Sequence, residues 1–224
     1  MTFSLVARCA ETGMFGVAIA SSSPAVAARC AYARAGVGAV ASQNVTDPRL
    51  GPLALDVMEQ GRSATDTVRQ ISEAADFSAY RQILAIDQHG QTGIHSGSES
   101  LGCWADAHGR DVASGGNLLA TADVPRAIVS AFEHATGHLG DRLLQAMQAG
   151  LDAGGEAGPI HSAGLLLVDQ VPWPVADLRC DWHETAPLDA LAALWSRYQP
   201  QMDDYVTRAL NPAAAPSYGV PGDA

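Results

Sequence analysis

Two short stretches of alternating or apolar residues near the start of the chain constrain its fold more than any other feature. Polar and apolar side chains alternate from Thr2 to Cys9, and residues 15–22 form a second strand-like stretch beyond the turn-forming pair Thr12-Gly13. A period of two residues is typical of a strand that buries one face, and a short turn between two such strands favours antiparallel pairing. We therefore expect a buried β-hairpin that begins at the second residue.

The rest of the chain predicts a layered arrangement of sheets and helices. A strand is expected at 35–43, helical structure at 52–75 with a break at Gly61, and a hairpin at 81–97. Ser63 and Asp66 make a capping box for the second half of the helical stretch. The Gly- and Ser-rich residues 98–117 are expected to form a loop, followed by helices near 123–136 and 140–153, a strand at 162–169 and two further helical stretches.

This order of elements favours an α+β or αββα domain, in which helix pairs cover the faces of antiparallel sheets. No boundary divides the chain, so one domain is expected over residues 1–224. Residues 170–224 are expected to form a C-terminal appendage whose end, rich in Pro, Ala and Gly, is an extended tail.

Charge and composition exclude several classes of function. The net charge is −11, which argues against nucleic acid and anionic membranes as partners. All 13 basic residues are arginines, so Schiff-base chemistry and a lysine-containing phosphate loop are excluded. Scattered cysteines and unpaired histidines give no support for a metal site. No apolar run is long enough to span a bilayer and no signal-peptide pattern is present, so a cytoplasmic location is expected.

Thr2 is the first candidate for chemistry. Methionine is normally removed ahead of a small residue, and the chain would then begin with a threonine hydroxyl beside a free α-amine. An α-amine titrates near neutral pH, at about 7.7–8.0, and can act as general base for the hydroxyl of its own residue. The alternative interpretation is that a threonine at position two has no special meaning.

Three further segments carry polar groups that could join such a site. The run "SGGN" at 114–117 is either an ordinary glycine turn or an oxyanion hole. In "SSS" at 21–23, Ser22 is expected on one face of the strand end and its two neighbours on the other, unless the register slips. His161 and Ser162 precede an apolar strand, where the serine can bind an amine. Arg81 either binds an acidic substrate or is an edge charge.

Taken together, these segments resemble one known family. The chain contains "MTFSLVAR", "GVAIASSSPAVAARCAYARAGVGAVASQNVTDPRLGP", "RQILAIDQHG", "GGNLLA", "AMQAGLDAGGEAG", "HSAGLLLVD", "PVADLRCDWH" and "APSYGVPGD" in that order. This sequence resembles the DUF1028 family, which is assigned to the N-terminal nucleophile (Ntn) hydrolase superfamily. The resemblance implies a four-layer αββα sandwich, with two antiparallel sheets between helix layers.

The resemblance also implies roles for individual residues. Thr2 would be the nucleophile and its amine the base, Gly116 and Asn117 would form the oxyanion hole, and Ser162 would hold the α-amine. Ser22 falls near the position at which proteasome-like proteins carry an acidic residue. Arg29 or Arg34 would replace the lysine of proteasome subunits, or nothing does.

The chain departs from the family's usual Asp-Arg-x-Gly run before the late strand, where it reads "GGEAGPIHS". Glu156 and His161 either substitute for that run or accompany a change of substrate. Arg29, Arg34, Arg81 and His161 are therefore the candidate substrate-binding residues.

From these residues we expect an amidohydrolase that cleaves a C–N bond of a small-molecule amide, with no metal or organic cofactor. The alternative is a non-catalytic small-molecule binder or a structural oligomer on the same fold, and a hydrolase of small peptides ranks third. The C-terminal aromatics either cover a partner subunit or belong to the core, and a homodimer is expected. These aromatics are Trp173, Trp182, Trp195 and Tyr198.

Overall fold

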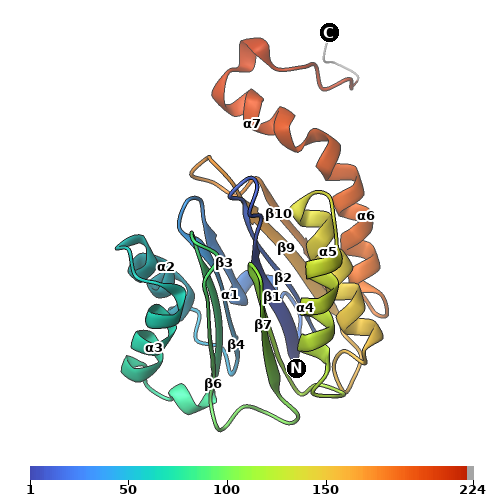
Figure 1. The fold of residues 1–224 in the computed structure, drawn as a ribbon. Helices are drawn as coiled ribbons and strands as arrows, with labels where there is room; N and C mark the ends of the chain where they lie inside the picture. Colours follow the sequence, from blue (N-terminus) through green and yellow to red (C-terminus); the bar gives the residue numbers. More distant parts are fainter. Residues whose placement is uncertain (221–224) are drawn as a thin grey trace.

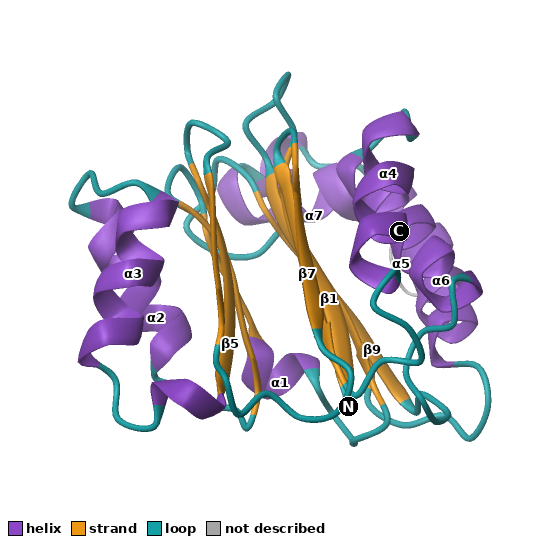
Figure 2. Cartoon of the chain, turned by 60° about the horizontal axis from the view of Figure 1, so that its bottom comes forward, coloured by secondary structure: helices purple, strands orange, loops and turns teal. Residues whose placement is uncertain are grey.

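The computed structural model describes residues 1–220, and residues 221–224 of the expected C-terminal tail lie outside the described residues. Two antiparallel sheets stack face to face, with helices on both outer sides (Figures 1 and 2). The four-layer αββα sandwich expected from the sequence is confirmed. No helix among residues 1–220 is both long and apolar enough to cross a membrane.

The larger sheet contains the N-terminal hairpin at its centre, in the strand order β10-β9-β2-β1-β8-β7. Its strands are β1 (Thr2–Arg8), β2 (Phe15–Ser21), β7 (Ala105–Gly109), β8 (Val112–Asn117), β9 (Ser162–Val168) and β10 (Ala176–Cys180). On β1, Phe3 and Leu5 pack in the core under the helices, whereas Val6 packs in the core between the sheets. Successive side chains of β1 therefore point alternately into two buried layers, one under the helices and one between the sheets.

The smaller sheet has the order β3-β4-β5-β6. Its strands are β3 (Ala31–Arg34), β4 (Gly38–Asn44), β5 (Arg81–Asp87) and β6 (Thr92–Ser96). The β5–β6 hairpin confirms the prediction for residues 81–97. The short helix α1 (Ala27–Cys30) leads from β2 into this sheet.

The helices cover the outer faces of the two sheets (Figure 2). On the smaller sheet lie α2 (Leu50–Glu59) and α3 (Ala64–Ala74), and the Ser63 side chain caps α3 by accepting from the Asp66 N–H, as predicted. On the larger sheet lie α4 (Val124–His134), α5 (Leu139–Asp152) and α6 (Pro187–Tyr198). The last helix, α7 (Met202–Leu210), projects beyond the sandwich in Figure 1.

Two expectations from the sequence differ from the structure. The segment 98–117 is not a loop, because its second half forms the β7–β8 hairpin. The alternation of polar and apolar side chains is hard to recognise in this hairpin, because β8 ("VASGGN") consists largely of small residues. The segment after residue 170 also contributes to the core, since β10 forms an edge of the larger sheet and Trp195 of α6 is only 3% exposed. Charged residues are typical of an edge strand, and those of β10 made the strand hard to recognise in the sequence.

The space between the sheets changes character along the strands. At one end it is filled by apolar side chains such as Val17, Leu84 and Leu166. At the other end, where β1 begins, the side chains between the sheets are mostly polar and include Ser4, Gln43 and Gln82. Thr2, the first residue of β1, lies at this polar end of the space between the sheets.

Candidate active site

Four polar residues occupy one row across the larger sheet at the start of β1. Thr2 pairs with Asn117 on β8, and Ser21 at the end of β2 pairs with Ser162 on β9. The β1–β2 register places Thr2 beside Ser21, and their hydroxyl oxygens are 3.4 Å apart. Because facing positions on neighbouring strands share a face, the pairing gathers side chains that are far apart in the sequence.

Met1 occupies part of this site. The hydroxyls of Thr2 and Ser21 both donate to the Met1 carbonyl oxygen in short hydrogen bonds. Thr2 is only 6% exposed with Met1 attached. Cleavage of the Met1–Thr2 peptide bond would remove this acceptor and leave the two hydroxyls beside a new α-amine.

The serine run connects Thr2 to a positive charge. The Ser21 hydroxyl lies 2.8 Å from the Ser23 hydroxyl and accepts from the Ser23 N–H at 3.1 Å. Arg29 donates to the Ser23 hydroxyl at 2.5 Å and to the carbonyls of Pro24 and Ala25. The hydroxyls of Thr2, Ser21 and Ser23 therefore form a chain that ends at the Arg29 guanidinium.

Ser22 contributes to the site in a different way. Its N–H donates to both carboxylate oxygens of Glu156, at 3.2 and 3.1 Å. Burial raises the pKa of Glu156 from 4.5 to about 7, and the nearby N-terminal amine and the Ser22 N–H and hydroxyl oppose that rise. The loop that carries Glu156 is held to the end of β8 by the bridge between Leu119 and Glu156.

Ser162 and His161 brace the same region from β9. The Ser162 hydroxyl donates to the Ser23 carbonyl at 2.6 Å and accepts from the Val26 N–H at 3.2 Å. The His161 N–H donates to the Ser21 carbonyl, while its ring stacks on Trp182 with 4.5 Å between centroids. Ser162 thus holds the loop after β2, and the His161 ring contacts an aromatic partner.

The "SGGN" run is strand rather than turn, and neither of its glycines has a positive φ. Gly116 instead allows a close approach, because a Cβ there would lie 2.6 Å from Leu119 Cδ2 and 3.0 Å from the Thr2 carbonyl oxygen. Its backbone pairs with strands on both sides. The Asn117 side chain is buried and donates to Gln82 Oε1 at 3.4 Å, so it faces the space between the sheets beside Thr2.

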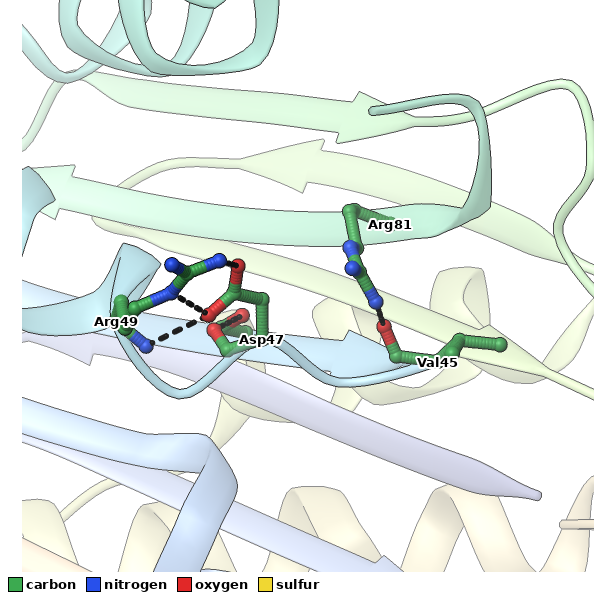
Figure 3. Close-up of polar contacts among 5 residues, drawn as sticks. Val45, Asp47, Arg49 and Arg81 are labelled. Atoms are coloured by element: carbon green, nitrogen blue, oxygen red, sulfur yellow. Dashed lines mark hydrogen bonds and ion pairs between the residues drawn. The ribbon is translucent and has the colours of Figure 1, made fainter. Parts of the chain in front are cut away.

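The two remaining candidate arginines have intramolecular partners. Arg34 is the last residue of β3, at the end of that strand away from the row, and forms ion pairs with Asp56 and Glu59 of α2, so it does not join the row. Arg81 donates to the Val45 carbonyl at the start of the loop that follows β4 (Figure 3). In the same loop the Arg49 guanidinium pairs with Asp47 and holds the pKa of that carboxyl near 2.

Four residues of the site were not predicted from the sequence: Ser21, Ser23, Gln43 and Gln82. The alternation of β2 did put Ser21 and Ser23 on one face, and counting back along the hairpin from its turn would have brought Ser21 opposite Thr2. The glutamines lie on the other sheet, and no sequence pattern predicts contacts between sheets.

Comparisons with known proteins agree with this fold. The model of the family of unknown function DUF1028 matches residues 2–191. A crystal structure of a DUF1028 protein from Silicibacter pomeroyi is similar with a TM-score of 0.82 and 28% identity, over 88% of each chain. No curated protein matches.

More distant matches come from the protein Anbu. Anbu (ancestral beta-subunit) from Yersinia bercovieri has a TM-score of 0.38 and 10% identity, over 91% of this chain and 97% of its own. A Gly-1 mutant of Anbu from Hyphomicrobium sp. strain MC1 has a TM-score of 0.44 and 10% identity, over 98% and 100%. On the family match and the Silicibacter structure, this chain belongs to the DUF1028 family.

Proposed function

We propose that this protein is an Ntn-type amidohydrolase that cleaves a C–N amide bond of a small molecule through Thr2, after removal of Met1. The observation that supports this proposal is the row of Asn117, Thr2, Ser21 and Ser162 at the polar end of the two sheets. A hydroxyl nucleophile, its own amine and a neighbouring amide donor are the groups that acyl transfer needs.

In the first half of the reaction, Thr2 Oγ attacks the amide carbon while the Thr2 α-amine accepts the hydroxyl proton. The negative charge that develops on the carbonyl oxygen accepts a hydrogen bond from Asn117 Nδ2. The Gly116 N–H, the second donor expected from the sequence, lies within the ladder between β1 and β7 and is not assigned this role. The C–N bond then breaks, the leaving amine takes the proton from the α-ammonium, and an acyl ester of Thr2 remains. In the second half, water loses a proton to the α-amine and attacks the ester carbon. The bond between that carbon and Thr2 Oγ then breaks, the α-ammonium returns its proton to Thr2 Oγ, and the acid is released.

The neighbouring residues have supporting roles in this proposal. The Ser21 hydroxyl accepts from the Ser23 N–H and donates to the Met1 carbonyl oxygen, so removal of Met1 frees its proton for a hydrogen bond to Thr2. Arg29, at the end of the hydroxyl chain, favours negative charge on those oxygens and takes the part that a lysine would play. Glu156 is buried close to the N-terminus and stabilises the α-ammonium that forms during attack.

Cofactor use, cellular location and oligomeric state are proposed as expected from the sequence. The mechanism uses no metal ion or organic cofactor, and the enzyme is expected to act in the cytoplasm as a homodimer. The projecting helix α7, whose Tyr205 and Leu210 are exposed, is consistent with contact between subunits. Of the aromatics expected at such a contact, Trp173 and Trp182 are exposed, whereas Trp195 is in the core.

A second function is favoured by one observation. The Met1 carbonyl accepts from both Thr2 and Ser21, and this arrangement would keep the hydroxyls engaged in a chain that retains Met1. Such a chain lacks the free Thr2 amine and would be a binding protein or a structural oligomer rather than an enzyme.

Turnover of a panel of small amides, followed by the release of free amine, tests the proposal. Thr2→Ala should abolish turnover, and Thr136→Ala, at an exposed threonine of the α4–α5 connection, should leave it unchanged. Turnover by Thr2→Ala would contradict the proposal. A folded, processed protein that binds amides without hydrolysing them would favour the binding function.

A further inference from the structure

Two glutamines, one on each central strand of the smaller sheet, are fully buried between the sheets. Gln43 on β4 and Gln82 on β5 are paired across the ladder, and each has 0% of its surface exposed. A buried amide without partners is costly, so the hydrogen bonds of both side chains must be satisfied inside the protein. They lie close to the row that contains Thr2, since Gln43 accepts a hydrogen bond from Ser4, which is two residues further along β1.

Backbone carbonyls fix the orientation of the Gln82 amide. Its Nε2 lies 3.3 Å from the Gly116 carbonyl, 3.4 Å from the Ala105 carbonyl and 3.0 Å from the Ser96 hydroxyl. A carbonyl oxygen only accepts hydrogen bonds, so the nitrogen must face these groups. Gln82 Oε1 therefore faces the opposite side and requires donors.

Two side-chain amides supply those donors. Gln43 Nε2 lies 2.8 Å from Gln82 Oε1, and Asn117 Nδ2 lies 3.4 Å from the same oxygen. The orientation of Gln43 is fixed independently, because its Nε2 also donates to the Gly115 carbonyl at 3.1 Å and its Oε1 accepts from the Ser4 hydroxyl at 2.6 Å. The network thus turns Asn117 Nδ2 toward the smaller sheet.

An amide nitrogen carries two hydrogens, and the contact with Gln82 uses one of them. Among residues 1–220 no hydrogen bond engages the second N–H of Asn117, and Asn117 is paired with Thr2 across the β1–β8 ladder. We propose that Gln82 is a positioning residue, which holds the Asn117 amide so that this second N–H meets the carbonyl oxygen of the amide substrate. The inference rests on the proposed function, because the oxyanion exists only if Thr2 attacks a carbonyl.

Acylation of Thr2 by a β-lactone, followed as intact mass against time, measures this effect. Gln82→Met should slow acylation about tenfold, the effect of losing roughly one hydrogen bond. In an Asn117→Ala background the same substitution should cause no further slowing, because residues that act as a unit are not additive. Gln43→Met, equally buried but not bonded to Asn117, is the matched control and should slow acylation less.

Equal slowing by Gln82→Met in both backgrounds would show a purely structural role and overturn the inference. No slowing by Gln82→Met would overturn it as well.

NMR of the Asn117 side chain separates failure of the inference from failure of the proposed function. In the unmodified protein, one Asn117 Nδ2 hydrogen should be protected from exchange. Its NMR signal is assigned by the absence of that signal in Asn117→Asp. The protection from exchange should disappear in Gln82→Met. If wild type takes no lactone but the protection behaves as stated, the orientation by Gln82 stands and the catalytic proposal fails. Rapid exchange of both hydrogens in the unmodified protein would overturn the positioning role without any variant.

Discussion

Replacement of Glu156 by glutamine should stabilise the protein at high pH and have a much smaller effect near pH 4. Burial raises the pKa of Glu156 from 4.5 to about 7, so the folded state binds this proton more tightly than the unfolded state does. The carboxyl therefore contributes stability below pH 4.5, and that contribution is lost as the pH rises toward about 7. A rise of this size corresponds to about 3 kcal/mol.

Glutamine has nearly the same shape and carries no charge, and its carbonyl can still accept from the Ser22 N–H. Urea unfolding of wild type and Glu156→Gln at pH 4 to 8 measures the difference in unfolding free energy. That difference should grow between pH 4.5 and about 7 and then level off. Glu73→Gln, at an exposed position on α3, is the matched control for the loss of one carboxylate. A flat profile for Glu156→Gln would refute the reasoning.

Four other substitutions test the site and its supports. Ser21→Ala should slow lactone acylation of Thr2 about tenfold, because one hydrogen bond is lost, whereas an unchanged rate would separate Ser21 from the site. Arg29→Met should slow acylation and increase proteolysis after residue 22, since three anchoring contacts are lost. Gly116→Ala should destabilise the protein by about 1–3 kcal/mol in urea, owing to the 2.6 Å approach to a leucine methyl group. Asp47→Asn should reduce stability above pH 4 and converge with wild type toward pH 2, where Asp47 becomes protonated; parallel pH profiles would contradict its pairing.

Local patterns predicted the elements that contain strong signals. The alternation of β1, the Ser63 cap and the β5–β6 hairpin are all present in the structure. The layered architecture followed from the order of elements and from the family resemblance. The β7–β8 hairpin was missed because small residues such as Gly115 and Gly116 hide the alternation, although their smallness is what allows the close approach to Leu84 and Leu119.

The site itself depends on contacts that no local pattern encodes. Ser21 rather than Ser22 lies beside Thr2 because of the hairpin register, and one residue of slip would exchange them. Glu156 reaches the N-terminus through a loop that bridges to the end of β8. Gln82 meets Asn117 only because two separate sheets stack, which is a property of the whole fold.

Peptide mapping after exposure of the purified protein to a β-lactone tests the central claim most directly. The account predicts an intact mass that lacks Met1, one adduct per chain, and that adduct on Thr2. A chain that retains Met1, or an adduct on another residue with Thr2 unmodified, would contradict a catalytic Thr2.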